Sequence, residues 1–263
     1  MKITINGLSV NIFGSPEKQS IIFVHGFPYD HSMWDFQIEA LQNNYYCVAY
    51  DVRGLGESIV GDGQYTMEFF VDDLFSVINE LKLVKPVLCG LSMGGYISLR
   101  AIERDQNIFS GLILCDTRAD ADDNGAKLRR SANINLINTE GLIKFTDLFV
   151  ANCFADETPQ EQEKLFLTTL HKTHKQNPAG VKGCIFAIMS RTDTTPFLPQ
   201  IKIPTLVICG AFDRLTPPPV MRELAARIPT AEFSAIPHAG HMTPLENPEM
   251  VNDLILGFME KLK

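Results

Sequence analysis

A serine flanked by glycines sets strong limits on how this chain can fold. The order Gly90-Leu91-Ser92-Met93-Gly94 directly follows the apolar run Val87-Leu88-Cys89, and helix-compatible residues 96–102 come after it. This context predicts a sharp strand-to-helix turn that lifts the serine hydroxyl clear of a sheet. Glycine fits on either side because a side chain would collide within so tight a turn. The alternative is an ordinary glycine-rich turn between a strand and a helix.

Short apolar runs recur along the chain, with helical patterns between them. The runs are continuous rather than alternating, which indicates strands covered on both faces and hence a mostly parallel sheet. Residues 3–10 alternate instead and are expected to form an edge strand. The predicted buried strands cover 21–24, 46–50, 87–91, 112–115, 205–209 and 232–236.

Helical stripes fill the gaps between these strands. One stripe starts behind Thr66, and the last helix begins with Asn247 as N-cap and Pro248 in its first turn. The alternation of strand and helix predicts a doubly wound α/β fold.

Residues 118–195 break the alternation, because they contain no strand-like run and their pattern indicates several helices. We expect this segment to be a helical cap inserted over one end of the sheet, with 1–117 and 196–263 forming the core. The apolar residues expected to be buried in the insertion are Leu136, Leu142, Phe145, Leu148, Phe149, Phe154, Leu165, Phe166 and Leu170.

Composition excludes some functions. The 263 residues carry a net charge of −8 without a Lys/Arg run, which argues against nucleic acid or an anionic membrane as partner. No signal-like or membrane-spanning stretch is evident, and the cysteines lack ligand spacing, so we expect a cytoplasmic protein with reduced thiols. His171 and His174 on a predicted helix are interpreted as a solvated face rather than a metal site. The expected partner is a small-molecule substrate, with no cofactor and no metal. The oligomeric state stays open, a homodimer included.

A serine nucleophile needs a base to activate it. His241 follows the last predicted strand and comes directly after Gly240, which allows a tight loop to aim its ring toward Ser92. His238, three residues earlier, is the competing candidate, and we expect it to pack or hydrogen-bond locally.

The base in turn needs an acid to orient it. Asp213 follows the predicted strand 205–209, and the chain order Ser92, Asp213, His241 is the order that hydrolases with such a serine turn use. A turn-capping role before Thr216 is the alternative for Asp213. Asp116, which ends the strand 112–115, is the rival acid.

Backbone amides are expected to hold the oxyanion. His25-Gly26-Phe27-Pro28 follows the strand 21–24, and Pro28 has no N–H to donate. The N–H groups of Phe27 and Met93 are therefore the candidate pair. His25 is expected to stabilise the loop.

Five motifs in this order resemble the α/β-hydrolase superfamily: His25-Gly26-Phe27, Asp51-Val52-Arg53-Gly54-Leu55-Gly56-Glu57-Ser58, Gly90-Leu91-Ser92-Met93-Gly94-Gly95, Gly210-Ala211-Phe212-Asp213 and Gly240-His241. Within it, the chain resembles the small esterase, 3-oxoadipate enol-lactonase and cofactor-free haloperoxidase (perhydrolase) group. The resemblance implies an eight-stranded, mostly parallel sheet flanked by helices, a helical cap, and Ser92, Asp213 and His241 as catalytic triad. It also implies structural roles for Asp51 and Arg53.

These observations predict a serine hydrolase that cleaves a carboxylic ester or lactone through an acyl-enzyme on Ser92. Several alternatives share the triad: an enol-lactonase-like activity, a perhydrolase, a carbon–carbon bond hydrolase, and a slow-turnover ligand receptor. An enol-lactonase needs a cation for the substrate carboxylate, so a buried cap arginine facing Ser92 would favour it. Arg118, Arg129, Arg130 and Arg191 are candidates, each expected to be a surface charge unless the fold brings it to the site.

Overall fold

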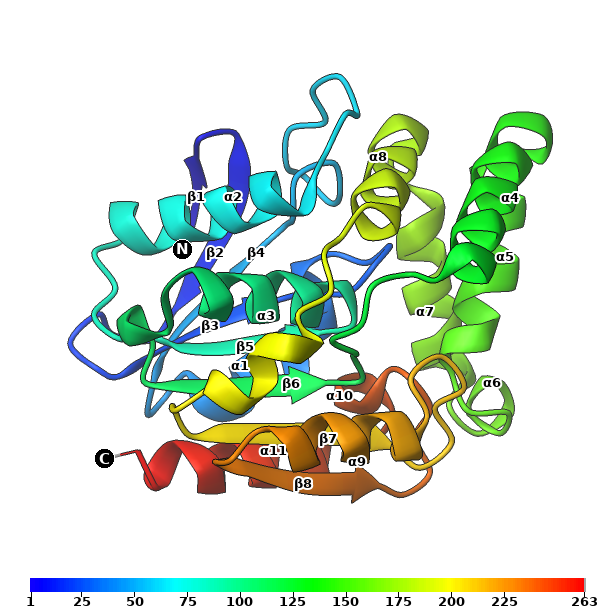
Figure 1. Ribbon diagram of the computed structural model, residues 1–263. Helices are drawn as coiled ribbons and strands as arrows, with labels where there is room; N and C mark the ends of the chain where they lie inside the picture. Colours follow the sequence, from blue (N-terminus) through cyan, green and yellow to red (C-terminus); the bar gives the residue numbers. More distant parts are fainter. Residues whose placement is uncertain (263) are drawn as a thin grey trace.

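A computed structural model describes residues 1–262 and places one eight-stranded sheet at the centre of the molecule (Figure 1). The strand order is β1-β2-β4-β3-β5-β6-β7-β8, and every pairing from β4 onward is parallel. The predicted eight-stranded, mostly parallel sheet is thereby confirmed. The strands are β1 (Lys2–Ile5), β2 (Leu8–Phe13), β3 (Ser20–Val24), β4 (Tyr46–Tyr50), β5 (Val87–Leu91), β6 (Gly111–Cys115), β7 (Thr205–Gly210) and β8 (Ala231–Ile236).

The prediction of one edge strand over residues 3–10 was wrong. The segment folds as an antiparallel hairpin, in which β1 pairs with β2 from Lys2↔Asn11 to Ile5↔Leu8. Asn6 and Gly7 form the turn with φ of 50° and 83°. Two central residues with positive φ are typical of the tight turn that matches strand twist, and Asn-Gly is its commonest sequence.

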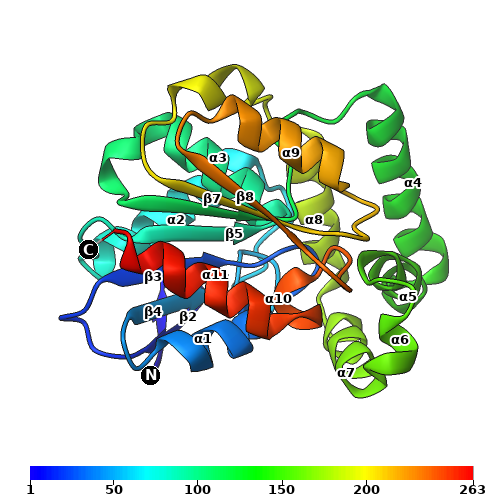
Figure 2. The same cartoon turned by 90° about the horizontal axis from the view of Figure 1, so that it is seen from below.

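Helices cover both faces of the sheet, as Figures 1 and 2 show from two directions. One face packs against α2 (Met67–Glu80), α3 (Met93–Asp105) and α9 (Pro218–Arg227), and the other against α1 (Asp35–Leu41), α10 (Thr243–Glu246) and α11 (Pro248–Glu260). Short 3-10 turns lie at His31–Trp34, Gln106–Ile108 and Thr195–Gln200.

Side chains cap the helices that the sequence marked. The Thr66 hydroxyl accepts a hydrogen bond from the Phe69 N–H at the start of α2, and the Asn247 side chain accepts one from Met250 at the start of α11. Each cap satisfies an N–H that has no partner within its own helix. Both predicted caps are confirmed.

Five helices join β6 to β7 and lie beyond the carboxyl end of the sheet (Figure 1). They are α4 (Asn124–Glu140), α5 (Leu142–Cys153), α6 (Thr158–Glu161), α7 (Glu163–His174) and α8 (Pro178–Met189). All five fall within residues 118–195, but the division into a core and a separate cap stays a prediction. Of the nine apolar residues expected to be buried here, Leu142, Phe145 and Phe154 are buried, Leu148 is 55% exposed, and the other five are half-buried.

All six cysteines are free thiols in buried positions, as predicted for the four in strands. Within residues 1–262, none of the helices combines the length and the apolar character needed to cross a membrane.

Candidate active site

Ser92 stands at the turn between β5 and α3 with an uncommon backbone conformation, φ 54° and ψ −113°. The neighbouring glycines leave no room for side chains. A Cβ on Gly90 would lie 2.4 Å from the Gly94 carbonyl oxygen, and one on Gly94 would lie 2.0 Å from the Val24 carbonyl oxygen. The strained turn predicted from the sequence is therefore present, and the tight packing around it holds Ser92 at the sheet edge.

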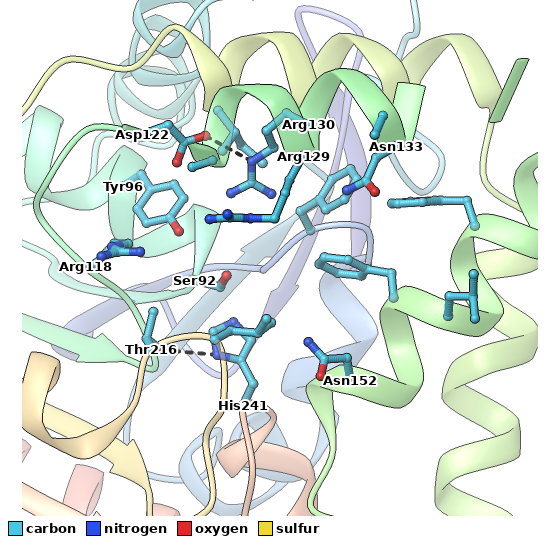
Figure 3. Close-up of a pocket in the computed structure, with 18 of the residues that line it drawn as sticks. Ser92, Tyr96, Arg118, Asp122, Arg129, Arg130, Asn133, Asn152, Thr216 and His241 are labelled. Atoms are coloured by element: carbon cyan, nitrogen blue, oxygen red, sulfur yellow. Dashed lines mark hydrogen bonds and ion pairs between the residues drawn. The ribbon is translucent and has the colours of Figure 1, made fainter. Parts of the chain in front are cut away.

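The Ser92 side chain faces a cavity of about 640 Å³ between the sheet edge and the helices α4, α5 and α8. Figure 3 shows Ser92 between His241 on one side and Tyr96 with Arg129 and Arg130 on the other. Aromatic and aliphatic side chains complete the wall: Phe27, Leu136, Phe145, Leu148, Phe149, Ile188 and Leu215.

His241 and Asp213 form a buried hydrogen-bonded pair, with His241 Nδ1 2.8 Å from Asp213 Oδ2. Burial alone would raise the pKa of Asp213, but the charge and hydrogen bond of His241 lower it to about 2. Thr216 adds two bonds, since its hydroxyl donates to Asp213 Oδ2 at 2.5 Å and its N–H donates to Oδ1 at 3.0 Å. Asp213 thus stays ionised near neutral pH and fixes the orientation of the imidazole.

Asp116, the rival acid, lies nearby but makes no hydrogen bond to His241. Its carboxylate accepts the Gly210 N–H at 2.8 Å and the Thr243 hydroxyl at 2.5 Å. Burial and the charge of Asp213 raise the pKa of Asp116 well above its ordinary value. The structure therefore pairs His241 with Asp213.

His25 and His238 lie outside the cavity lining. His238 is exposed. His25 is fully buried, and its Nε2 accepts the Val52 N–H at 2.8 Å, which fits the loop-stabilising role expected for it.

The Phe27 and Met93 N–H groups sit at the ends of β3 and β5, which are adjacent parallel strands. Neither donates a hydrogen bond within the part of the chain that the structure describes. Met93 N–H is free because it belongs to the first turn of α3. The two donors predicted for an oxyanion are therefore both available.

Asp51 and Arg53 brace the loop after β4. Asp51 accepts N–H bonds from His31 at 2.9 Å and Glu57 at 2.8 Å. Burial alone would raise the pKa of Asp51, but its hydrogen bond with His31 lowers it below the ordinary value. Arg53 makes a two-bond contact with Asp73. These contacts agree with the structural roles that the resemblance implies.

Of the four arginines expected to be surface charges, Arg129 is exposed as expected, Arg118 and Arg130 are half-buried, and Arg191 is not a surface charge. Arg191 is buried, pairs with Asp122 at 2.6 Å and packs over the Tyr96 ring at 4.3 Å. The other three line the cavity around Ser92. Only for Arg191 does the ion-pair partner, Asp122, lie far away along the chain among residues 1–262.

The three cavity arginines differ in their partners. Arg118 pairs with Asp120 at 2.8 Å, and Arg130 pairs at 3.1 Å with Asp122, which also holds Arg191. Arg129 makes no ion pair or hydrogen bond with another residue of the described 1–262. It therefore offers an uncommitted cation at the cavity.

Two groups of three acidic, histidine or cysteine side chains lie close enough to hold a metal ion: Asp30, His31 and Asp51, and Asp116, Cys209 and Asp213. Asp51, Asp116 and Asp213 already accept hydrogen bonds from N–H and O–H groups. These acceptors serve the fold and the histidine, so neither group resembles an open metal site.

The sequence did not predict two residues that support the His241–Asp213 pair, Thr216 by direct contact and Glu246 through the neighbours of His241. Thr216 was seen only as part of a turn, although its hydroxyl bonds Asp213. Glu246 was not considered, yet its buried carboxylate accepts the N–H groups on both sides of His241. Burial raises the pKa of Glu246, and these bonds partly offset the rise. Its position five residues after His241 was the available signal.

Comparison with known proteins places this geometry in context. The family described as "Alpha/beta hydrolase family" matches residues 21–254. A solved esterase from Thermogutta terrifontis, with malate bound, is 34% identical and superposes with a TM-score of 0.94 over 100% of this chain and 98% of its own. An enol-lactonase from Burkholderia xenovorans LB400 is 26% identical, with a TM-score of 0.91 over 99% and 100% of the two chains. The 3-oxoadipate enol-lactonase 2 of Acinetobacter baylyi is 26% identical over 97% of this chain and 93% of its own length.

Proposed function

Since the chain belongs to the alpha/beta hydrolase family, we propose that it is a serine hydrolase that cleaves a small carboxylic ester or lactone through an acyl-enzyme on Ser92. One observation carries the proposal. The strained serine and a histidine bonded to a buried carboxylate face the same cavity (Figure 3).

The first half-reaction forms the acyl-enzyme. Ser92 Oγ attacks the substrate carbonyl carbon while His241 Nε2 takes its proton, and Asp213 stabilises the imidazolium through Nδ1. The carbonyl oxygen becomes an oxyanion, which the Phe27 and Met93 N–H groups bind. Each such donor contributes about 3 kcal/mol to transition-state stabilisation. Collapse of the intermediate breaks the bond to the alkoxy oxygen, which takes the proton from His241.

The second half-reaction releases the acid. Water gives a proton to His241 and attacks the Ser92 ester, and the second tetrahedral intermediate collapses with return of the proton to Ser92. An open ester yields an alcohol and a carboxylate. A lactone yields a single product, because the leaving oxygen stays tethered to the acyl group.

Labelling with a fluorophosphonate tests the proposal, since the probe reacts with an activated serine. We expect wild-type protein to be labelled and to hydrolyse phenyl butanoate, and Ser92→Ala to do neither while unfolding at the same temperature. Ser98→Ala is the matched control, because Ser98 lies on α3 and, among residues 1–262, its hydroxyl bonds only the Gly94 carbonyl. Turnover by Ser92→Ala at the wild-type rate would contradict the mechanism.

A second candidate, an enol-lactonase-like hydrolysis of carboxylate-bearing substrates, is supported by Arg129, which lines the cavity with Ser92 although it is exposed rather than buried. Three arginines line the cavity against one aspartate, and Arg129 has no partner within the described residues. The relatives include enol-lactonases and an esterase with malate bound. A carboxylate on the substrate would complete a charge-assisted contact with the guanidinium.

A matched pair of esters tests this preference. Monophenyl succinate carries a carboxylate where phenyl butanoate ends in a methyl group. We expect Arg129→Gln to lower kcat/KM for the anionic ester about tenfold and to leave the neutral ester unchanged. Lys127→Gln, on an exposed part of the same helix, removes the same charge away from the cavity. Equal effects of the two substitutions would reject the role of Arg129.

A further inference from the structure

The connection between α5 and α6, residues 153–158, contacts the loops that carry both Asp213 and His241. The His241 N–H donates to the Cys153 carbonyl at 2.7 Å. Arg214, the neighbour of Asp213, donates to the Phe154 carbonyl at 2.9 Å and pairs with Asp156. The acid loop and the histidine loop are thus both bonded to one short segment of the inserted helices.

Glu246 joins this segment to the histidine loop through its two carboxylate oxygens. Oε1 accepts the Ala155 N–H at 2.7 Å and the Thr158 hydroxyl at 2.6 Å. Oε2 accepts the Gly240 N–H at 2.8 Å and the Met242 N–H at 3.2 Å. One buried side chain therefore binds the residues directly before and after His241 and, at the same time, the α5–α6 connection.

The two segments are also in close van der Waals contact. A Cβ on Gly240 would lie 2.6 Å from the Ala155 nitrogen and 2.7 Å from the Phe154 carbonyl carbon. Because the backbones already touch, neither can move toward the other without displacing it. The hydrogen bonds of Glu246 hold the two segments together at this contact.

We propose that Glu246 is the positioning residue for His241: it holds the imidazole at the place from which it takes the Ser92 proton, and it makes that place depend on the α5–α6 connection. The inference rests on the proposed function, because it assigns His241 the role of base. Glu246 does not line the cavity. It therefore acts on proton transfer and not on substrate binding.

Glu246→Gln tests the proposal with little change in shape. All four partners of the Glu246 carboxylate are N–H or O–H donors. In glutamine, an NH₂ group replaces one of the two oxygens and cannot accept from them, so the two bonds to that oxygen are lost. Misplacement of His241 should lower kcat about 10- to 100-fold with KM within twofold. Fluorophosphonate labelling should slow by the same ratio, and the pH midpoint of kcat/KM should move, since the imidazole then sits differently against Asp213.

Thr158→Val removes only the side-chain bond from the α5–α6 connection and keeps the residue volume. We expect a smaller loss of kcat, about threefold to tenfold, again at constant KM. Thr146→Val is the control, because the Thr146 hydroxyl is buried in α5 and, within the described part of the chain, bonds only carbonyls of its own helix. Thr146→Val should leave kcat unchanged. If Glu246→Gln does not fold, the comparison of Thr158→Val with Thr146→Val tests the positioning role of Glu246 instead.

The outcomes separate this inference from the proposed function. No labelling of wild-type protein would reject the serine mechanism itself. Labelling of wild type together with an unchanged kcat and pH midpoint in folded Glu246→Gln, with only a lower melting temperature, would overturn the positioning role and leave the mechanism in place. Loss of kcat in Glu246→Gln and Thr158→Val, but not in Thr146→Val, would support it.

Discussion

The ends of β6 and β7 carry two buried aspartates in very different circumstances. These strands are parallel neighbours, and Asp116 follows one while Asp213 follows the other. Their carboxylates, with the Cys209 thiol, lie within 4.8 Å of one another. Both are almost completely shielded from water. Position at a strand end and burial therefore do not distinguish the two acids.

The partners of the two carboxylates make the difference. Asp213 bonds His241, and this contact lowers the pKa of Asp213 to about 2 despite burial. Asp116 bonds only an N–H and a hydroxyl, so burial raises its pKa well above the ordinary value. Burial disfavours the charged form of both acids. Within residues 1–262, His241 bonds Asp213 and not Asp116, so the charged form is favoured at β7 and the neutral form at β6.

Replacing Asp213 should produce the largest effect. In Asp213→Asn the amide can donate to His241 Nδ1, which leaves the proton on Nε2 and removes the base from Ser92. We expect kcat to fall about 1,000- to 10,000-fold with the fold retained, as measured by ester turnover and circular dichroism. A loss of less than tenfold would mean that another acid, with Asp116 the nearest, can take over.

Acidification should change the contributions of the two carboxyl groups to stability in opposite directions, which is the next largest expected effect. The pKa of Asp213 is lower in the folded protein than in the unfolded chain, so its stabilisation is complete above about pH 5 and is lost as pH falls toward 2. When the pH is lowered from 6 to 3, the loss of this contribution should reduce the free energy of unfolding by about 1 kcal/mol. The contribution of Asp116 to stability should change in the opposite direction. Its pKa is raised in the folded protein, so the folded state binds a proton more readily than the unfolded chain and is stabilised at this residue as pH falls.

Urea unfolding at the two pH values measures this difference. The loss of stability on acidification should be smaller in Asp213→Asn than in wild type and larger in Asp116→Asn. Identical slopes for all three proteins would show that neither carboxyl has a shifted pKa.

The two hydroxyls that bond these carboxylates allow a finer test. Thr216 and Thr243 each donate to one aspartate at 2.5 Å. Thr216→Val should lower kcat about fivefold, because Asp213 loses a bond that fixes its orientation toward His241. Thr243→Val removes the equivalent bond from Asp116 and should change kcat less than twofold. An equal loss of kcat in Thr216→Val and Thr243→Val would show that the two aspartates do not differ in their effect on catalysis.

Local chemistry explains what the sequence could predict. The buried strands, the caps at Thr66 and Asn247 and the strained turn at Ser92 each depend on residues within a few positions of one another. The hairpin at Asn6-Gly7 was equally local, because the apolar positions change from odd numbers (Ile3, Ile5) to even numbers (Leu8, Val10) at the turn.

Contacts between distant segments explain what the sequence could not predict. The sequence predicted Asp213 as the acid but left Asp116 as its rival, because both follow a strand; the loops after β6 and β7 bring Asp213 to His241. Glu246 gains its role from Ala155 and Thr158, which lie about ninety positions away along the chain. Arg129 is identified as an uncommitted cation only once the partners of its neighbours are known.

Replacing Asp116 should have the smallest effect and completes the comparison. An asparagine side chain has the shape of the protonated acid, and its amide oxygen can accept the Gly210 N–H that Asp116 accepts now. Because burial already favours the neutral form, Asp116→Asn should keep kcat within about threefold and leave the melting temperature at pH 7 equal or higher. A fall in kcat like that of Asp213→Asn would show that the β6 acid carries charge for catalysis. The contrast between the two strand ends would then be wrong.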